Sequence, residues 1–379
     1  MNQVINFNEP YKTNRIKKYV NLALESNYYS SGEFEHRCKE FLKNKYGFVN
    51  TFITHSATGA LEMSALLIRQ NNLKKKVFMP SYTFSSTANA FLRAGFKIEF
   101  LDVNKENFMI DLKKSAKIAA GNILVPVHYG GNSIDMDGYT KFKKNGILVE
   151  DAAQSLGTKW RNKQVGLFGD MAAVSFHHTK NVQGGFAGLL SVNNENYLER
   201  AKYVYERGTD RSKVISGIKS KYEWVEIGSS FQVPDVISAI VLAQLEEVEL
   251  VEKKREKVYN FYLKYFSKAE IIDACSIPIN SANSRTNYHA FFIIFSKKEL
   301  RSKFLEFTKR NGINCYIGYV PLHTSIMGSK LKLNVRLPIT EDYSELVVRL
   351  PIHTNIESEQ LLKIESVFNN FFEKEQIFK

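Results

Sequence analysis

The stretch DMAAVSFHHTKNVQGGFAG (170–188) joins a short apolar run to a lysine and then to a cluster of glycines. Its first part, MAAVSF (171–176), is typical of a strand that is buried on both faces of a sheet. Lys180 follows this run, and it is either an ordinary surface lysine or a lysine held for carbonyl chemistry. A Walker phosphate loop is excluded, because its glycines precede the lysine and form the phosphate cradle.

Short apolar runs alternate with helical patterns between about residues 55 and 195. The apolar runs predict strands at KVFMP (76–80), KIEFLDV (97–103), NILVPVH (122–128), GILVEDA (146–152) and MAAVSF (171–176). The segments between them predict helices, among them TGALEMSALLIRQ (58–70) and SSTANAFLRAG (85–95). Buried strands separated by helices predict an α/β fold with a mostly parallel central sheet.

The second half of the chain predicts a long helix and a smaller lobe. Residues 234–266 begin with Pro234, which suits the first turn of a helix, and no helix breaker follows. This segment is apolar at first and charged later, which is typical of a helix that leaves one lobe for another. We predict a large domain over 17–250, a small C-terminal α+β domain over 251–379 with a strand at 287–295, and an N-terminal arm over 1–16.

The composition is that of an ordinary globular enzyme, with 44% hydrophobic and 24% charged residues in a chain of 379. The first residues have no apolar signal-peptide core, and the longest apolar runs are too short to span a bilayer. Cys38, Cys275 and Cys315 show no paired spacing, so we expect neither a disulfide framework nor a zinc site. These features predict a cytoplasmic enzyme with no metal and no membrane segment.

The net charge of +13 raises the question of a polyanionic partner. Basic residues are scattered and mixed with acids, as in EKKREK (252–257), and no basic run alternates with aromatic residues as a base-stacking surface would. We therefore predict no nucleic-acid partner. The positive surface is expected to steer an anionic small substrate toward the protein.

Two segments at predicted strand ends are suited to hold a phosphate. THSATGALE (54–62) places Ala57 and Thr58 at the start of an apolar-periodic helix, where free amides and a hydroxyl bind anions. Ser175 lies five residues before Lys180, where its hydroxyl can reach the same group. An ordinary helix N-cap is the alternative for the first segment.

Three further side chains follow predicted strands, at the sheet edge where open α/β folds bind ligands. Phe84 follows the strand 76–80 and can lie flat on a planar ring, although a core aromatic gives the same pattern. Asp151 ends the strand 146–152, where a buried carboxylate is costly unless a cationic group or a surface arginine pairs with it. Lys180 lies past its strand end, where its amine can reach the same ring.

One cofactor requires all of these groups together. Pyridoxal phosphate needs a phosphate cradle, a stacking aromatic ring, a carboxylate at the pyridinium nitrogen and a lysine for the Schiff base. The carboxylate keeps the ring protonated, so that the ring withdraws the electron pair left when a proton departs from a substrate carbon. The joint occurrence of these features predicts that Lys180 is the Schiff-base lysine of a pyridoxal-phosphate enzyme.

The motifs PSYTFSSTANA, VPVHYGGNSIDMDG, VEDAAQSLGT and GDMAAVSFHHTKN resemble those of the DegT/DnrJ/EryC1/StrS family of sugar aminotransferases, and the likeness covers nearly the whole chain. This resemblance implies the aspartate aminotransferase-like fold, which is fold type I of the pyridoxal-phosphate-dependent transferases. Within the family, HSATGALEMSALL, SFHHTKN, RGTDRS and KYEWVEIGSS are most similar to dTDP-4-amino-4,6-dideoxygalactose transaminases.

The resemblance also implies a role for each residue of the site. Lys180 is the catalytic residue and carries the cofactor, while Asp151 meets the pyridine nitrogen. Gln154 lies near the ring hydroxyl, and Phe84 stacks on the ring. The implied phosphate ligands are Ala57, Thr58, Ser175 and, from a neighbouring subunit, Ser230. A homodimer with shared active sites follows from the last of these.

Two segments depart from the family pattern. Many members carry Gly-x-Asn-x-Arg where this chain has GSSFQ (228–232), so an arginine contact is lost at Gln232. The loop after the lysine usually ends Gly-Glu-Gly-Gly, whereas this chain has GFAG (185–188), in which Phe186 replaces an acidic group. We expect this ring to pack on an apolar face: the substrate's 6-deoxy side, a neighbouring subunit's aromatic, or its own strand start. Other substrate-side candidates, in the second lobe, are Tyr316 and His323.

The predicted reaction transfers an amino group from L-glutamate to C4 of dTDP-4-keto-6-deoxy-D-glucose. The product is dTDP-4-amino-4,6-dideoxy-D-galactose, for lipopolysaccharide or surface polysaccharide biosynthesis. The alternatives are the C4 epimer dTDP-4-amino-4,6-dideoxy-D-glucose and another nucleotide ketosugar. A C3 dehydratase is less favoured, because such relatives carry histidine at the position of Lys180. A DNA-binding regulator needs a helix-turn-helix, for which the first 30 residues leave no room, and a non-catalytic relative is expected to lose Lys180 or Asp151.

Overall fold

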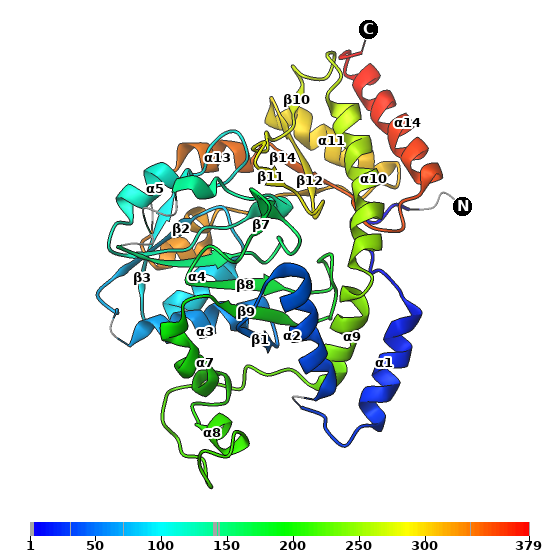
Figure 1. Cartoon of the computed structure of the whole chain (residues 1–379). Helices are drawn as coiled ribbons and strands as arrows, with labels where there is room; N and C mark the ends of the chain where they lie inside the picture. Colours follow the sequence, from blue (N-terminus) through cyan, green and yellow to red (C-terminus); the bar gives the residue numbers. More distant parts are fainter. Residues whose placement is uncertain are drawn as a thin grey trace.

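The centre of the molecule is a seven-stranded sheet in the order β1-β9-β8-β5-β4-β2-β3 (Figure 1). The computed structural model describes residues 4–30, 32–70, 72–138, 142, 145–333 and 335–378. The strands are β1 (Thr51–Thr54), β2 (Lys76–Pro80), β3 (Lys97–Leu101), β4 (Ile123–Leu124), β5 (Ile147–Asp151), β8 (Met171–Ser175) and β9 (Gly188–Val192). Within this sheet β9 is antiparallel to its neighbours β1 and β8, and the other pairs are parallel. The sheet is thus mostly parallel, as the sequence predicts.

Both faces of this sheet are apolar and covered by helices. Successive side chains of a strand point to opposite faces, so Ala173 packs in the core with α3, whereas Val174 packs in the core with α2 and α9. The first face is covered by α3 (Ala57–Arg69), α4 (Ser85–Arg93) and α7 (Leu198–Tyr205), and the second by α1 (Asn14–Glu25), α2 (Glu33–Tyr46) and α9 (Asp235–Leu245). Because both faces are covered, the strand ends are left to bind ligands.

A second, antiparallel sheet forms the smaller lobe, in the order β10-β12-β14-β13. Its strands are β10 (Cys275–Ser276), β12 (Phe291–Phe295), β13 (Tyr316–Ile317) and β14 (Val347–Leu350), and its helices are α10 (Val248–Phe266), α11 (Lys298–Arg310) and α14 (Ser358–Lys374). The core is rich in aromatic rings, and Phe304 contacts Phe295 and Phe368 with centroid distances of 5.1 Å. The parallel sheet and this α+β lobe confirm the predicted fold class.

The predicted long helix over 234–266 is in fact two helices, α9 and α10, separated at Glu246–Glu247. Glu247 leaves helical backbone angles, with φ −115° and ψ 12°. Its carboxylate accepts hydrogen bonds from Thr13 Oγ1 at 2.7 Å and from Arg15 Nε at 3.0 Å. The break therefore coincides with tertiary contacts. For this reason the local sequence contains no helix breaker that would predict it. Among the helices of the described residues, α10 included, none is long and apolar enough to cross a membrane.

Two predicted strands are shorter than expected by four or more residues. Of residues 287–295, only Phe291–Phe295 forms a strand, because Tyr288 has a left-handed φ of 58° that a strand cannot contain. Of residues 122–128, only Ile123–Leu124 forms β4, since a proline that cannot donate to a ladder follows closely. Both shortened ends lie beside the cavity described below.

The N-terminal segment, for which an arm over 1–16 is predicted, contacts both lobes and leads into α1 at Asn14; residues 1–3 lie outside the described residues. Ile5 forms a bridge with Ile313 of the smaller lobe. The backbone N–H of Tyr11 donates to Gln183 Oε1 at 2.8 Å, in the loop after Lys180. The segment therefore connects the smaller lobe to the lysine loop. We propose that the break between α9 and α10 divides the domains, close to the predicted boundary at residue 250.

Candidate active site

A cavity of about 390 Å³ lies at the carboxyl ends of β5 and β8, between the large sheet and the smaller lobe. The structure brings a set of predicted residues together in its wall: Ala57, Thr58, Phe84, Asp151, Gln154, Ser175, Lys180 and Phe186. They come from four separate segments of the chain, 57–58, 84, 151–154 and 175–186. The sheet edge predicted from the strand pattern is therefore the edge at which these residues meet.

The start of α3 has the form of an anion cradle. Ser56 caps the helix, and its Oγ accepts from the backbone N–H of Gly59 at 3.0 Å. The backbone N–H groups of Ala57 and Thr58 precede the intrahelical ladder, and both residues line the cavity. The hydroxyl of Thr58 lies 2.7 Å from that of Ser86, which adds a second polar group to the cradle. A helix N-terminus of this kind favours a phosphate through its amides and its dipole.

The glycines after Lys180 allow the lysine loop and the cradle to meet. Gly185 has a φ of +79°, in the left-handed region that favours glycine. A Cβ at Gly188 would lie 2.4 Å from the backbone nitrogen of Ala57, so only glycine lets β9 begin beside the first turn of α3. The glycine cluster thus positions the lysine loop without forming a phosphate loop itself.

The amine of Lys180 faces the cavity and has no hydrogen-bond partner among the described residues. Burial and the charge of Arg349 lower the pKa of Lys180 to about 8, while the carboxylate of Asp151 partly opposes this shift. A lysine with a lowered pKa is neutral more often near pH 7, and the neutral amine is the nucleophile. The site therefore favours carbonyl chemistry over an ordinary surface role.

Asp151 ends β5 with its side chain buried in the cavity wall. Its Oδ2 accepts from Thr87 Oγ1 at 2.7 Å, and its Oδ1 accepts from the backbone N–H of Ala153 at 3.2 Å. Desolvation raises the pKa of Asp151, although these two bonds and the charge of Lys180 act in the opposite direction. Within the described residues it has no arginine partner, so the surface-arginine alternative is wrong. A buried carboxylate without a cation is suited to a protonated ring nitrogen.

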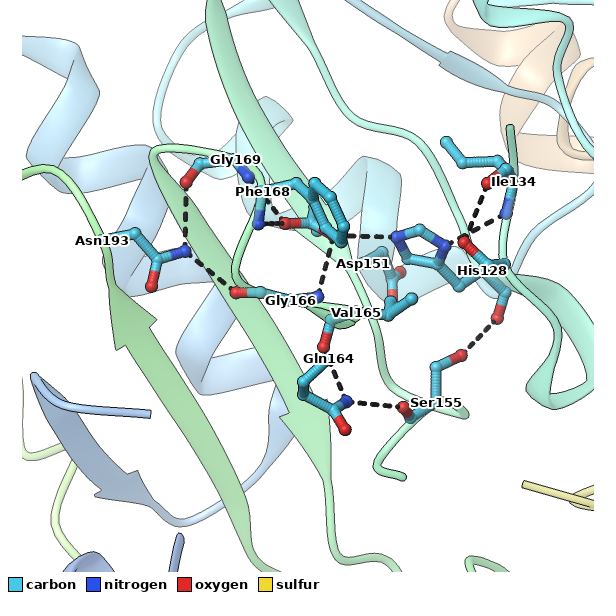
Figure 2. Close-up of polar contacts among 12 residues, drawn as sticks. His128, Ile134, Asp151, Ser155, Gln164, Val165, Gly166, Phe168, Gly169 and Asn193 are labelled. Carbon is cyan, nitrogen blue, oxygen red and sulfur yellow. Dashed lines mark hydrogen bonds and ion pairs between the residues drawn. The ribbon is translucent and has the colours of Figure 1, made fainter. Parts of the chain in front are cut away.

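The neighbouring carboxylate, Glu150, fixes the same strand end from the other side. It is fully buried and accepts from three backbone N–H groups within residues 166–169 at 2.6 to 2.8 Å. His128 Nε2 lies 3.0 Å from Glu150, and Ile134 N–H donates to His128 Nδ1, which assigns the proton to Nε2. Figure 2 shows His128 and this loop beside Asp151. Desolvation acts to raise the pKa of Glu150, but His128 and the N–H donors bring it below its usual value.

Phe84 and Gln154 both lie on the cavity wall, but they differ in how far the protein already occupies their side chains. The Phe84 ring is 58% exposed, and the ring of Tyr319 lies 6.2 Å from it. Gln154 is already bonded, since its Oε1 accepts from Gly130 N–H at 2.8 Å and its Nε2 donates to Tyr319 Oη at 3.1 Å. A planar ligand can therefore cover Phe84 directly, whereas Gln154 must share or exchange a partner to contact it.

Three predicted residues lie outside this cavity wall. His323 is buried between Ser81 Oγ at 2.6 Å and Glu341 Oε1 at 3.1 Å, so its ring nitrogens are used in packing the lobes together. Tyr316 packs edge-on against Phe7 with a centroid distance of 5.0 Å. Neither side chain lines this cavity, and a substrate-side role for the two stays a prediction. The third residue, Ser230, lies on an exposed segment of the same chain.

Phe186 lies at the cavity rim with 73% of its surface exposed. Its ring meets His177 edge-on at 5.5 Å, and the two rings of His177 and His178 lie 4.0 Å apart. The ring thus has an aromatic neighbour on one side and is open on the other.

Sequence reasoning missed the residues that the smaller lobe brings to the cavity, chiefly Arg349, Arg255 and His289. Arg255 donates to the carbonyl oxygens of Tyr288 at 3.0 Å and of His289, and burial lowers its pKa to about 9. One local signal was present for Arg349. It stands within the apolar run of β14, just as Asp151 stands at the end of an apolar strand.

Comparison with known proteins agrees with this geometry. The sequence profile of the DegT/DnrJ/EryC1/StrS aminotransferase family matches residues 10–369. The chain belongs to this family. It is 25% identical over 361 residues to the UDP-4-amino-4,6-dideoxy-N-acetyl-β-L-altrosamine transaminase of Campylobacter jejuni, with 93% of each chain covered. It is 24% identical over 381 residues to the GDP-perosamine synthase of Vibrio cholerae, with 96% of this chain and 98% of that protein covered.

A solved structure shares the same fold over the whole length. Helicobacter pylori PseC, an aminotransferase involved in the biosynthesis of pseudoaminic acid, superposes with a TM-score of 0.89 at 23% identity, covering 98% of this chain and all of that one. Aminotransferases of this family depend on pyridoxal phosphate, and solved structures of the fold include PLP and PMP forms. The cradle, the open aromatic ring, the buried carboxylate and the lysine fit that cofactor.

Proposed function

We propose that this aminotransferase transfers the amino group of L-glutamate to C4 of dTDP-4-keto-6-deoxy-D-glucose, giving dTDP-4-amino-4,6-dideoxy-D-galactose. The observation that carries the aminotransferase chemistry is the meeting of Lys180, Asp151 and the start of α3 in one cavity. The relatives support a nucleotide-linked amino sugar as the product class, since their names specify UDP- and GDP-linked substrates or products. The dTDP nucleotide and the galactose configuration rest on the motif resemblance.

The residues of the cavity have separate tasks in holding the cofactor. Ala57, Thr58 and Ser175 would bind its phosphate, Asp151 would hold a proton on its ring nitrogen, and Phe84 would stack on its ring. When bound, pyridoxal phosphate supplies the electron sink that accepts the pair left at a substrate carbon.

Lys180 moves the protons of both half-reactions. Its amine removes a proton from the α-carbon of glutamate, and it later delivers a proton to C4 of the sugar. The lowered pKa of about 8 allows the same group to act as base and then as acid near neutral pH. The face of the sugar that meets this amine decides between the galactose product and its C4 epimer.

We also propose a homodimer in which a second copy completes the site. Apolar side chains gather on the exposed segment that follows α8 (Arg211–Ile215), and Figure 1 shows this segment projecting from the body of the molecule. Trp224 is 79% exposed and Ile218 is 73% exposed. Such a patch favours a protein partner. In the proposed dimer this segment brings Ser230 to the phosphate cradle of the other copy.

The test is a product analysis with a choice of nucleotide. Protein loaded with pyridoxal phosphate is incubated with L-glutamate and, separately, the dTDP-, UDP- and GDP-linked 4-keto-6-deoxy sugars. Release of 2-oxoglutarate identifies the substrate, and the H3–H4 coupling in the NMR spectrum gives the C4 configuration. The proposal predicts turnover with the dTDP sugar and an axial amine. A preference for UDP or GDP sugars, which the relatives make the second candidate, contradicts the nucleotide assignment.

A further inference from the structure

The N-terminal strap (residues 5–11) passes from the smaller lobe to the large lobe, and Figure 1 shows it in blue before α1. The N–H of Ile5 donates to the carbonyl of Gly312 at 2.8 Å, and the N–H of Asn314 donates to the carbonyl of Ile5 at 3.0 Å. Both partners lie in the smaller lobe, directly after the end of α11. The start of the strap is therefore held in a fixed place on that lobe.

The other end of the strap, Tyr11, is held by three side chains. Its backbone N–H donates to Gln183 Oε1 at 2.8 Å, and its carbonyl accepts from Gln244 Nε2 at 2.8 Å. Its hydroxyl donates to Glu247 Oε2, at the break between α9 and α10. Gln183 and Gln244 are both buried, which strengthens their hydrogen bonds relative to bonds in water. Tyr11 is thus fixed at the break between the two helices and contacts the loop that carries the lysine.

The lysine loop (177–187) depends on contacts with other segments of the chain. It contains Gly185 in a left-handed conformation, and glycine leaves the backbone more freedom than any other residue. Two buried side chains that follow the lysine make such contacts. Asn181 Nδ2 donates to the carbonyl of Asn287 at 2.7 Å, just before β12, and Gln183 binds the strap. The loop is therefore held on one side by the smaller lobe and on the other by the strap.

We propose that Tyr11 is a positioning residue for Lys180 and that it acts through Gln183. The inference rests on the proposed function, because it assumes that Lys180 moves protons in the reaction. Such a transfer requires the amine within hydrogen-bond reach of the reacting carbon. A displaced loop therefore lowers the rate of the chemical step, although every group that touches the substrate is still present. The expected result is a lower maximal rate at an unchanged substrate affinity.

The alternative is that the bonds of Tyr11 only stabilise the fold, and Tyr19 of α1 provides the comparison. The Tyr19 hydroxyl donates to Glu246 Oε2 at 2.6 Å, at the same break between α9 and α10. Among the described residues, however, Tyr19 makes no hydrogen bond to the lysine loop. A bond that only stabilises the break has the same effect at both tyrosines, whereas positioning of the lysine is confined to Tyr11.

The first measurement is hydrogen–deuterium exchange of the lysine loop in full-length protein loaded with pyridoxal phosphate, without substrate. The proteins are the wild type, Tyr11→Phe, Gln183→Met and the matched control Tyr19→Phe. Gln183→Met keeps the length of the side chain but removes the acceptor for the Tyr11 N–H. We expect the loop amides to exchange about 3- to 10-fold faster in Tyr11→Phe and Gln183→Met, as for the loss of one hydrogen bond. Tyr19→Phe should keep the wild-type exchange in this loop.

The second measurement is the glutamate half-reaction of the same loaded proteins, followed by absorbance in single-turnover experiments over a range of L-glutamate concentrations. The maximal rate should fall by about 3- to 10-fold in Tyr11→Phe and Gln183→Met, with an unchanged half-saturating concentration. The double variant should be no slower than the slower single variant, because both changes break the same chain of contacts. Tyr19→Phe should react at the wild-type rate.

Three results overturn the proposal: unchanged loop exchange or an unchanged maximal rate in a folded Gln183→Met protein, equal changes in Tyr19→Phe, and a higher half-saturating concentration at an unchanged rate. The last of these would assign the strap to donor binding. If Gln183→Met does not fold, Tyr11→Phe decides by the same comparison. A wild type that does not react with L-glutamate contradicts the proposed function, whereas the exchange comparison still tests whether the strap holds the lysine loop.

Discussion

The two walls of the cavity are built in different ways. On the side of the large sheet, Asp151, Ser175 and Lys180 each follow or end a strand, and the sheet edge brings them together. On the side of the smaller lobe, Arg349 of β14 and His289, just before β12, come more than a hundred residues later and reach the cavity only when the lobes pack. The first wall carries the residues that we propose for the cofactor. Its residues are encoded at local strand ends, whereas the residues of the second wall depend on tertiary packing.

Among the substitutions in the first wall, Lys180→Ala is expected to cause the largest loss of turnover. We expect turnover to fall by at least about 10³-fold, because the variant lacks both the attachment point and the proton carrier. Pyridoxal phosphate should still bind through the cradle at the start of α3. Equilibrium dialysis and a steady-state assay measure the two effects, and wild-type transamination by this variant would contradict the assignment.

Asp151→Asn should remove the electron sink while leaving the cofactor bound. The loss of an electrostatic partner of this kind costs on the order of 10²-fold in rate. Glu150→Gln is the matched control, since the two carboxylates are adjacent but only Asp151 faces the cavity. The control should lower the free energy of unfolding by about 2–3 kcal/mol, because an amide cannot accept from all of its donors. A Glu150→Gln protein that is stable but has low turnover, together with an Asp151→Asn protein with normal turnover, would assign the electrostatic role to Glu150 instead of Asp151.

The pH dependence of cofactor attachment tests whether the two walls are coupled. The pKa of Lys180 in the protein without cofactor is about 8, and the neutral amine is the reactive form. The attachment rate should therefore rise through pH 8 and fall as the pH drops below it. Arg349→Gln removes a nearby positive charge, so it should raise this pKa and move the profile to higher pH. Stopped-flow absorbance measures the shift, and an unmoved profile would mean that the walls act independently.

Phe186→Ala concerns the cavity rim, and its expected effect is the smallest. If a ligand covers the open side of the ring, its removal costs roughly 1–2 kcal/mol of apolar contact. The KM for the nucleotide sugar should then rise by about 10-fold, with the glutamate half-reaction unchanged. Single-turnover kinetics of each half-reaction provide the comparison. Equal slowing of both halves would instead assign the ring to the dimer contact.

The sequence predicted the first wall well because its signals are local. A carboxylate or lysine at the end of an apolar strand has few roles other than binding a ligand. Gly188 is required where β9 meets α3. The sequence is less informative where packing decides. His323 pairs with Glu341 and Tyr316 packs on Phe7, and neither lines the cavity, so their substrate-side role stays a prediction.

The same reason explains the errors in the elements. The break between α9 and α10 coincides with carboxylates that bind the N-terminal segment, and no single window of sequence contains both partners. The shortened β12 begins after Tyr288, whose carbonyl is held by Arg255 from α10. Contacts between distant segments therefore set the limits of elements whose type was predicted correctly.

The central claim is that Lys180 is the residue that carries pyridoxal phosphate in this cavity. The most direct test is borohydride reduction of the loaded protein, followed by proteolysis and mass spectrometry of the labelled peptide. The account predicts one phosphopyridoxyl group per chain, on the peptide that contains Lys180, and no label in Lys180→Ala. Label on another lysine, or a fully active protein that borohydride does not label, would contradict it.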